Sequence, residues 1–235
     1  MYEERPLEVK VWGQFACYTR PENKVERVSY EVPTPSAARG TLESIFWKPQ
    51  FDWVIRRIKV LKEINHFSIT RNEVKTKASY PTLKRWASED NPDNHYLVED
   101  KRTQRHSLIL KNVAYIIQAD QVLRPGVDPE NLAKYRAAFR RRVNKGQCFR
   151  RPFLGCREFS AFFGPPSEED QALPINKDLG FTLFDLIFDD EVTRKGELKT
   201  KGPAVALFFQ AELRQGVLEV PRVLYNQTLA NKENR

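Results

Sequence analysis

Alternating apolar and polar positions predict three long strands in the first half of the chain. The segment LEVKVWGQFACYT (7–19) alternates from its first residue, and Gly13 interrupts it, which indicates a bulge or the close approach of another segment. A second alternating segment covers residues 51–61. A third covers residues 105–121, and its alternation changes register near Asn112.

A helix is predicted between the first two strands, over residues 34–49. Thr34 can cap its N-terminus, Pro35 suits the first helical position, and Pro49 stops it. Gly40 lies in the interior of this helix, where glycine costs about 1 kcal/mol relative to alanine. We therefore expect another part of the chain to pack against the backbone at Gly40.

A second helix is predicted after the third strand. Asp128 provides a cap, and Pro129 and Glu130 suit its first turn. Because a helix advances about 100° per residue, its apolar positions form one stripe that should face the sheet. This stripe consists of Leu132, Tyr135, Phe139 and Val143. An adjacent stripe consists of Lys134, Arg141 and Lys145, so that Tyr135 borders both the core and a cationic face.

An apolar segment at 152–164 predicts one more strand, which completes the order strand, helix, strand, strand, helix, strand. This order is typical of a ferredoxin-like, or RRM-like, α+β domain, which we assign to residues 1–164. Residues 65–101 form a polar, turn-rich insertion in it. Strands at 179–190 and 204–221, the latter turning at Gln215 and Gly216, predict a small antiparallel β subdomain with a polar tail over residues 165–235.

Length and composition indicate a soluble globular protein. The 235 residues suffice for one domain or two closely joined subdomains, and they are 40% hydrophobic and 30% charged. No apolar segment follows the N-terminus, and no eighteen apolar residues occur in a row, so we expect no membrane association. Three cysteines are an odd number that fits a reducing compartment, and we expect the protein in the cytoplasm.

The positive charge of the chain is concentrated in one window. The net charge is +8, from 39 basic and 31 acidic residues, whereas residues 133–157 contain nine basic residues and no acid. The rest of the chain therefore sums to −1. A concentrated field of one sign attracts a polyanion, and nucleic acid is the leading candidate ahead of an acidic protein or an anionic lipid surface.

The predicted RNA contacts follow from this window and from the basic residues at the first helix. They are Arg136, Arg140, Arg141, Arg142, Lys145, Arg150 and Arg151 from the window, together with Arg39 and Lys48. A solvated helix face is the plainer interpretation of such a charge run.

The sequence offers little for metal or cofactor chemistry. The three histidines, His66, His95 and His106, are scattered, and there is no paired-ligand motif or glycine-rich phosphate loop. The one dense carboxylate group comprises Asp185, Asp189, Asp190 and Glu191. It could hold Mg²⁺, but such groups more often end a strand and enter a turn. We therefore expect neither a metal nor a cofactor.

RNA can be cut without a metal, because its own 2′-hydroxyl can attack the neighbouring phosphate. The enzyme then supplies a base, an acid for the leaving 5′-oxygen and cations for the charge on phosphorus. Lys134 and Tyr135 are of suitable types. From the pattern alone Lys134 also fits a solvated charge, Tyr135 a core aromatic with its hydroxyl at the rim, and His106 an ordinary polar residue.

Four segments carry a resemblance to a known family. ACYTRPENKVERVSYEVPTPSAARGTLESIFWKP (16–49) resembles the N-terminal signature of the Cas-five family of CRISPR-associated proteins, in its type I-C (Dvulg) branch. KGQCFRRPFLGCREFSAFF (145–163) resembles its central signature, and LGFTLFDLIF (179–188) and AELRQGVLEVP (211–221) fit its C-terminal part. The resemblance spans nearly the whole chain and is weakest over residues 65–101.

The resemblance implies a RAMP-type ferredoxin-like domain followed by a small β domain. It also implies a metal-independent endoribonuclease that cuts the repeat hairpins of precursor CRISPR RNA, and stays on the 5′ handle within an effector complex. The family's catalytic positions correspond by motif to Phe46, where relatives have tyrosine or histidine, and to Lys134 and Tyr135, where they have a Lys-His pair. Phe46 cannot exchange a proton, and Tyr135 can donate one but is a poor base at neutral pH. Tyr30 and His106 are conceivable substitutes.

Two functions from different classes remain open. The first is an endoribonuclease with Lys134 stabilising charge and Tyr135 acting as acid or orienting the hydroxyl. It produces a cyclic phosphate and a 5′-hydroxyl. The second is a non-catalytic subunit that clamps the handle, which the phenylalanine at position 46 favours. Type I-C systems usually lack a separate processing enzyme, which favours the first. The expected partners are the RNA and the backbone and large subunits of the effector complex, with DNA as a further candidate.

Overall fold

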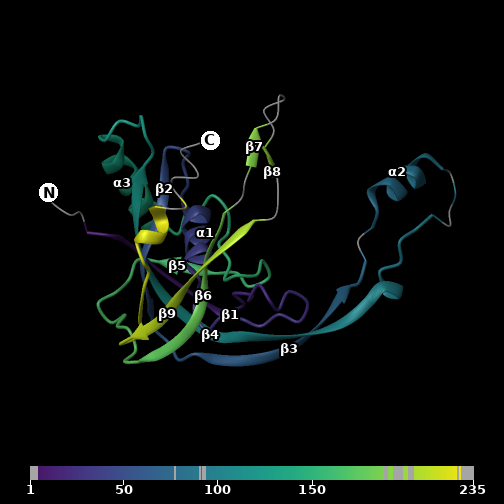
Figure 1. The fold of residues 1–235 in the computed structure, drawn as a ribbon, viewed down its shortest axis with the longest axis horizontal. Coiled ribbons are helices and arrows are strands. Elements are labelled where there is room, and N and C mark those ends of the chain that lie inside the picture. Colours follow the sequence, from purple (N-terminus) through teal and green to yellow (C-terminus); the bar gives the residue numbers. More distant parts are fainter. Residues whose placement is uncertain are drawn as a thin grey trace.

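The computed structural model describes residues 5–76, 78–89, 91, 94–187, 190–192, 198–200, 204–226 and 228, with the backbone alone for 190–192 and 198–200. Its main feature is a curled antiparallel sheet in the order β5-β1-β4-β2-β10-β9-β6, in which β3 pairs with an extension of β4 (Figure 1). The strands are β1 (Leu7–Ala16), β2 (Phe51–Val60), β3 (Asn65–Val74), β4 (Arg102–Leu123), β5 (Phe162–Gly164), β6 (Lys177–Ile187), β9 (Val205–Arg214) and β10 (Val217–Glu219). A separate pair comprises β7 (Asp190–Val192) and β8 (Leu198–Thr200).

The helix predicted over 34–49 is α1 (Pro35–Ile45). The Thr34 hydroxyl caps it by accepting a hydrogen bond from the backbone N–H of Ala37 at 3.2 Å, as the sequence predicts. The helix ends before Pro49, because Phe46 already has an extended backbone with φ of −150°. The last residues before the proline therefore lead out of the helix, and this exit forms part of the site described below.

The second predicted helix is α3 (Asn131–Lys145), which begins later than its sequence signals indicate. The Asp128 carboxylate accepts a hydrogen bond from the Glu130 N–H at 3.0 Å, which closes a turn before the helix instead of capping the helix itself. Gly146 ends α3 in the left-handed conformation with φ of 63°. The chain then reverses toward α1.

Helices α1 and α3 pack into one cluster of buried side chains above the sheet. The predicted stripe of α3 is confirmed for three of its four residues, since Phe139 and Val143 are buried and Tyr135 is half-buried against the same cluster, whereas Leu132 is half-exposed at the start of the helix. The Phe139 ring contacts Trp53 of β2, with 4.8 Å between ring centroids. Each fully buried side chain of this size stabilises the fold by about 1.5–3 kcal/mol, so the packing fixes the orientation of α3.

The strand predicted at 152–164 shortens to β5, which is the largest departure in the body of the molecule. Residues 153–160 instead form a turn that is closed by a bridge between Phe153 and Ser160. Gly155 has φ of 83°, and a Cβ there would lie 2.0 Å from the Cys17 carbonyl oxygen. The close approach of another segment predicted at Gly13 is also confirmed, since a Cβ added there would lie 2.7 Å from the Leu154 side chain.

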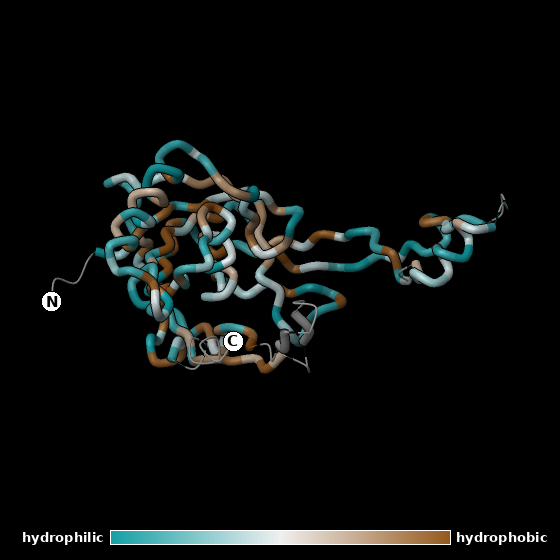
Figure 2. Tube along the Cα trace, turned by 90° about the horizontal axis from the view of Figure 1, so that it is seen from above, coloured by the Kyte–Doolittle hydropathy of each residue, from teal (hydrophilic) through white to brown (hydrophobic). Residues whose placement is uncertain are grey.

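The polar segment at 65–101 is not a loop. β3 pairs with the first part of β4 to form a two-stranded ribbon, and α2 (Tyr80–Ser88) and a 3-10 turn (Glu99–Lys101) lie at its end. Ten residues of strand extend the ribbon by roughly 30 Å. Figure 2 shows that it projects from the body and is largely hydrophilic, which explains why apolar alternation does not reveal it.

The last third of the chain is built from antiparallel strands, as predicted. The turn at Gln215 and Gly216 is confirmed, and both residues have positive φ. These strands are hydrogen-bonded to the first part of the sheet, because β10 pairs with β2. Among the described residues no helix has the length and apolar character needed to cross a bilayer. The polar tail lies mostly outside the described residues.

Candidate functional site

The exposed face of α3 and the segment after it form a cationic surface. Its exposed basic side chains are Lys134, Arg140, Arg141, Lys145, Arg150 and Arg151. The window 133–157 contains no acidic residue that could neutralise them. Clustered cations of this kind produce a positive potential that suits a chain of phosphates.

Two of the predicted RNA contacts do not belong to this surface. Arg136 is only 3% exposed, and its guanidinium donates to the carbonyl oxygen of Arg5. Arg39 donates two hydrogen bonds of 2.8 Å to the Asp185 carboxylate and one of 3.3 Å to Glu43. Burial by itself would lower the pKa of Arg39, but the charges of Asp185 and Glu43 raise it. Both arginines therefore have structural roles in this fold.

Arg142 joins α3 to the end of α1. Its guanidinium donates to the carbonyl oxygen of Ile45 at 2.7 Å and lies over the ring of Phe46, 5.1 Å from the centroid. The carbonyl groups in the last turn of a helix lack partners within the helix, so a charged donor there is well placed. The side chain remains partly exposed, beside the cationic surface.

Three aromatic rings meet below Arg142. Tyr135 of α3 lies 6.4 Å from Phe46 and 5.5 Å from Phe51 between ring centroids, and Phe46 lies 5.7 Å from Phe51. Phe46 is only 4% exposed and belongs to the core, whereas Tyr135 is half-buried and Lys134 is exposed beside it. Phe46 and Tyr135 thus belong to one aromatic cluster, Lys134 is the neighbour of Tyr135 in α3, and Phe46 is a core residue.

The two conceivable substitutes do not join this cluster. Tyr30 is 2% exposed, its hydroxyl accepts from the Leu183 N–H at 3.3 Å, and burial raises its pKa. His106 lies in the part of β4 that pairs with β3, where its Nδ1 is 3.2 Å from the Thr70 hydroxyl. The ribbon extends away from α3 (Figure 1).

The carboxylate group around β6 does not form a metal site in the described part of the chain. Asp185 is paired with Arg39, Asp189 lies outside the described residues, and the side chains of Asp190 and Glu191 are not described. Within the described residues there is no group of three side chains arranged to hold a metal ion.

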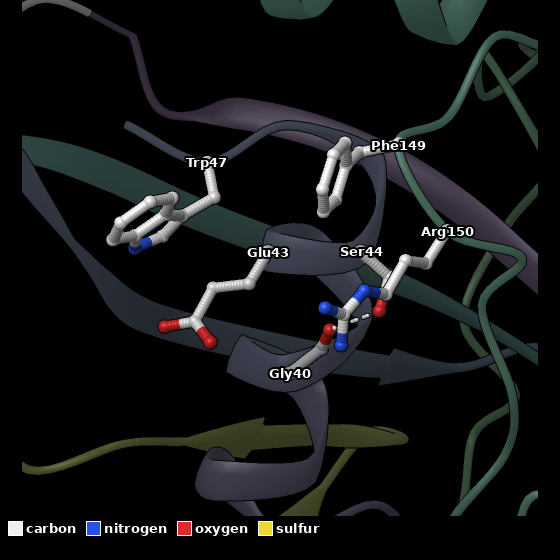
Figure 3. Close-up of a pocket in the computed structure, with 6 residues that line it drawn as sticks. All are labelled: Gly40, Glu43, Ser44, Trp47, Phe149 and Arg150. Atoms are coloured by element: carbon white, nitrogen blue, oxygen red, sulfur yellow. Dashed lines mark hydrogen bonds between the residues drawn. The ribbon is translucent and has the colours of Figure 1, made fainter. Parts of the chain in front are cut away.

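A pocket of about 410 Å³ opens beside the end of α1, and the sequence interpretation did not include it. Its lining consists of Gly40, Glu43, Ser44, Trp47, Phe149 and Arg150 (Figure 3). The Phe149 and Arg150 N–H groups both donate to the Ser44 carbonyl oxygen, at 3.0 and 2.9 Å. The signal in the sequence was Gly40. Apart from its chain neighbours and the backbone of its own helix, no atom lies within 4 Å of the position that its Cβ would occupy. The prediction that another part of the chain packs against Gly40 is therefore wrong. This face of α1 opens into the pocket instead.

Two of the three cysteines lie close together between β1 and the turn at 153–160. The thiol of Cys156 contacts the Cys17 carbonyl oxygen at 3.6 Å and accepts from the Arg27 guanidinium at 3.3 Å. Its hydrogen bond with the Cys17 thiol, helped by Thr19 and Arg27, lowers the pKa of Cys156 to about 6. The same interaction raises the pKa of Cys17.

Comparison with known proteins places these features in a family. Residues 6–221 match the family model Cas_Cas5d, described as "CRISPR-associated protein (Cas_Cas5)". The chain is 49% identical over 229 residues to the "CRISPR pre-crRNA endoribonuclease Cas5d" of Thermus thermophilus, covering 94% of this chain and 93% of the relative. It is 43% identical over 226 residues to the protein of the same name from Mannheimia succiniciproducens, covering 92% and 94%.

The fold also matches a solved structure. The crystal structure of a CRISPR-associated protein superimposes with a TM-score of 0.62 at 23% identity, covering 94% of each chain. At this identity the likeness concerns the fold, and it shows that the curled antiparallel sheet with its helices has a precedent.

Proposed function

Because the chain belongs to the Cas5d family of CRISPR-associated proteins, we propose that it is an endoribonuclease that cuts the repeat hairpins of precursor CRISPR RNA. The observation that carries this proposal is the identity of 49% and 43%, over nearly the full chain, to two relatives named as pre-crRNA endoribonucleases. The contact of Tyr135 with Phe46, beside the cationic surface, supports the location of the active site at the start of α3.

The proposed reaction uses the RNA's own 2′-hydroxyl as nucleophile. The bond from O2′ to phosphorus forms while the bond from phosphorus to O5′ breaks, which leaves a 2′,3′-cyclic phosphate and a 5′-hydroxyl. Tyr135 donates a proton to O5′ or orients the attacking hydroxyl. The Lys134 ammonium stabilises the negative charge on phosphorus, and in its neutral form it can accept the proton from O2′. This route runs without a metal ion.

The phosphate grip consists of the exposed cations of the surface and further cations at the end of α1. They are Arg140, Arg141, Lys145, Arg150 and Arg151, together with Arg142, which lies over the Phe46 ring, and Lys48, which follows Trp47 in the chain. Arg136 and Arg39 are excluded from it because both are engaged within the protein. Such contacts release counterions and provide most of the affinity for a nucleic acid.

The fold supports a finer assignment of the domains. The strand order β5-β1-β4-β2, with α1 and α3 packed above it, fits a RAMP-type ferredoxin-like domain over residues 1–164. The ribbon is its insertion. Residues 165–235 form a small antiparallel β subdomain that continues the same sheet through β10.

A non-catalytic RNA-binding subunit is the second candidate, and one observation favours it. Phe46 occupies a family catalytic position without a group that exchanges protons, and it is buried. In this alternative the cationic surface clamps the 5′ handle and another protein cuts. In both cases we expect the protein to hold the handle after cleavage, beside the backbone and large subunits of a type I-C effector complex, with DNA as a further candidate partner.

Cleavage of the cognate repeat hairpin in EDTA tests the proposal. We expect cutting at one position that disappears when a single 2′-deoxy nucleotide precedes the scissile phosphate. Lys134→Ala should abolish cutting with a modest loss of affinity. The matched control is Lys84→Ala, an exposed lysine on α2 at the end of the ribbon, which should cut like the wild type. Binding without cutting would leave the clamp alone. A requirement for Mg²⁺ would overturn the proposed mechanism.

A further inference from the structure

The pocket beside α1 has two aromatic walls that are exposed to solvent. Trp47 is 50% exposed and Phe149 is 70% exposed, and Figure 3 shows them on opposite sides of the pocket. Large apolar side chains gain little stability when they remain exposed, so their placement around one hollow calls for a ligand. Flat aromatic rings beside a cationic surface are the usual platforms for unstacked RNA bases.

The walls are held in fixed positions before any ligand binds. The Ser44 carbonyl oxygen accepts hydrogen bonds from both Phe149 and Arg150, which ties the segment after α3 to the last turn of α1. The Arg150 guanidinium also lies 5.4 Å from the centroid of the Phe149 ring. A site that is already ordered loses less entropy when its ligand binds.

Glu43 determines which chemistry the pocket accepts. Its carboxylate lies below the Trp47 ring in Figure 3, and it accepts a hydrogen bond of 3.3 Å from the Arg39 guanidinium. A carboxylate repels a phosphate group and accepts hydrogen bonds from N–H groups. In a region that otherwise attracts phosphates, this acceptor suits the Watson–Crick edge of a base that carries N–H donors.

Gly40 leaves the space that a base requires. No atom outside its own helix lies within 4 Å of the position that a Cβ would occupy. Gly40 lies in the middle of α1, where every residue except proline favours the helix more than glycine does. The volume of about 410 Å³ falls in the range of roughly 300–1,000 Å³ that is typical of small-ligand sites.

We propose that this pocket binds one unstacked guanine base of the RNA, held between Trp47 and Phe149, with its N1–H and N2 amine donating to the Glu43 carboxylate. Guanine is the base that offers two adjacent donors on this edge. Adenine and cytosine each offer one amine on this edge, and uracil offers a single N–H, at N3, between two carbonyl oxygens that the carboxylate repels. The inference rests on the proposed function and adds to it a residue set that selects a nucleotide beside the cutting site.

Binding measurements with the cognate repeat RNA test the pocket. Trp47→Ala and Phe149→Ala should each weaken binding by about 5- to 150-fold, because each removes one face of the stack. The matched control is Phe181→Ala, whose side chain is 72% exposed on β6 and outside the pocket, and it should bind like the wild type. Gly40→Ala should weaken binding, and Gly40→Leu should weaken it further. Both should raise Tm, so that unfolding cannot explain the loss of affinity.

Single guanines of the repeat are then replaced in turn by inosine, which lacks the N2 amine. At one position of the repeat, inosine should weaken binding to the wild-type protein by at least about fivefold. The same inosine RNA should bind Glu43→Gln no more weakly than the unmodified RNA does. If the wild type binds and cuts the repeat while the pocket variants and inosine change nothing, the pocket inference is wrong and the proposed function stands. If the wild type neither binds nor cuts the repeat, both are wrong.

Discussion

Removing one oxygen atom from Tyr135 separates its proposed chemistry from its packing. The ring contacts Phe46 and Phe51 at centroid distances of 6.4 and 5.5 Å, and phenylalanine would keep both contacts. The hydroxyl belongs to a half-buried side chain at the rim of the core. We therefore expect Tyr135→Phe to change the free energy of unfolding by no more than about 0.5 kcal/mol.

The expected catalytic effect is much larger. A positioned general acid contributes about 10²- to 10⁴-fold to a rate, which corresponds to roughly 2.7–5.5 kcal/mol of barrier. Affinity should remain within about twofold, because the grip consists of cations that Tyr135→Phe does not touch. Tyr135→Ala also loses the ring, and it should cost roughly 2–3 kcal/mol of stability, below the 3–5 kcal/mol of a fully buried aromatic residue.

Single-turnover cleavage of the labelled repeat in EDTA measures the effect, with the Kd and Tm determined for each variant. The matched control is Tyr30→Phe, which removes a buried hydroxyl that accepts from the Leu183 N–H and is not part of the ring cluster of Tyr135, Phe46 and Phe51. It should cut at the wild-type rate. If Tyr135→Phe cuts within about threefold of the wild type, or if Tyr30→Phe is the variant that stops cutting, the assignment of Tyr135 is wrong.

Three further predictions follow from named contacts. Replacing Arg140, Arg141 and Lys145 by alanine should flatten the slope of log Kobs against log salt by about 2–3 units, and an unchanged slope would exclude them as phosphate contacts. Arg39→Ala should lower the free energy of unfolding by about 2–4 kcal/mol in urea, because it leaves Asp185 unpaired, and Arg39→Ala with Asp185→Ala should recover part of this loss. Because hydrogen bonding to the Cys17 thiol lowers the pKa of Cys156 to about 6, its thiolate persists down to that pH. In a Cys148→Ser background, alkylation by iodoacetamide should therefore rise through about pH 6, and a midpoint above pH 8 would contradict this.

Elements with local signals could be predicted from the sequence, and those that depend on distant contacts could not. α1 begins where Thr34 and Pro35 indicate, because the cap acts within one turn. The segment at 153–160 is apolar enough for a strand, yet it turns because Gly155 lies against the Cys17 carbonyl. The ribbon escaped prediction because no side chain of β3 is buried, and apolar alternation in it is limited to Phe67 and Ile69.

The position of the cationic surface could be predicted from the sequence, but which arginines belong to it could not. Arg136 and Arg140 belong to the same helix and the same basic run, but Arg136 faces inward and donates to Arg5, more than a hundred residues away in the sequence. Arg39 has its partner in Asp185 on β6. Composition counts both as cations, whereas in the tertiary structure one donates to a backbone carbonyl oxygen and the other to a carboxylate.

The end of α1 connects the two parts of the proposed site. Along residues 44–47, Ser44 and Trp47 line the pocket, while the Ile45 carbonyl and the Phe46 ring contact Arg142 and Tyr135 of α3. Consecutive Cα atoms are about 3.8 Å apart, so a base in the pocket and a phosphate at Tyr135 would belong to nearby nucleotides. Phe46 then has a structural role that needs no hydroxyl, because its buried ring fixes the position of the pocket relative to α3. It follows that pocket variants should change where the RNA is cut as well as how tightly it binds.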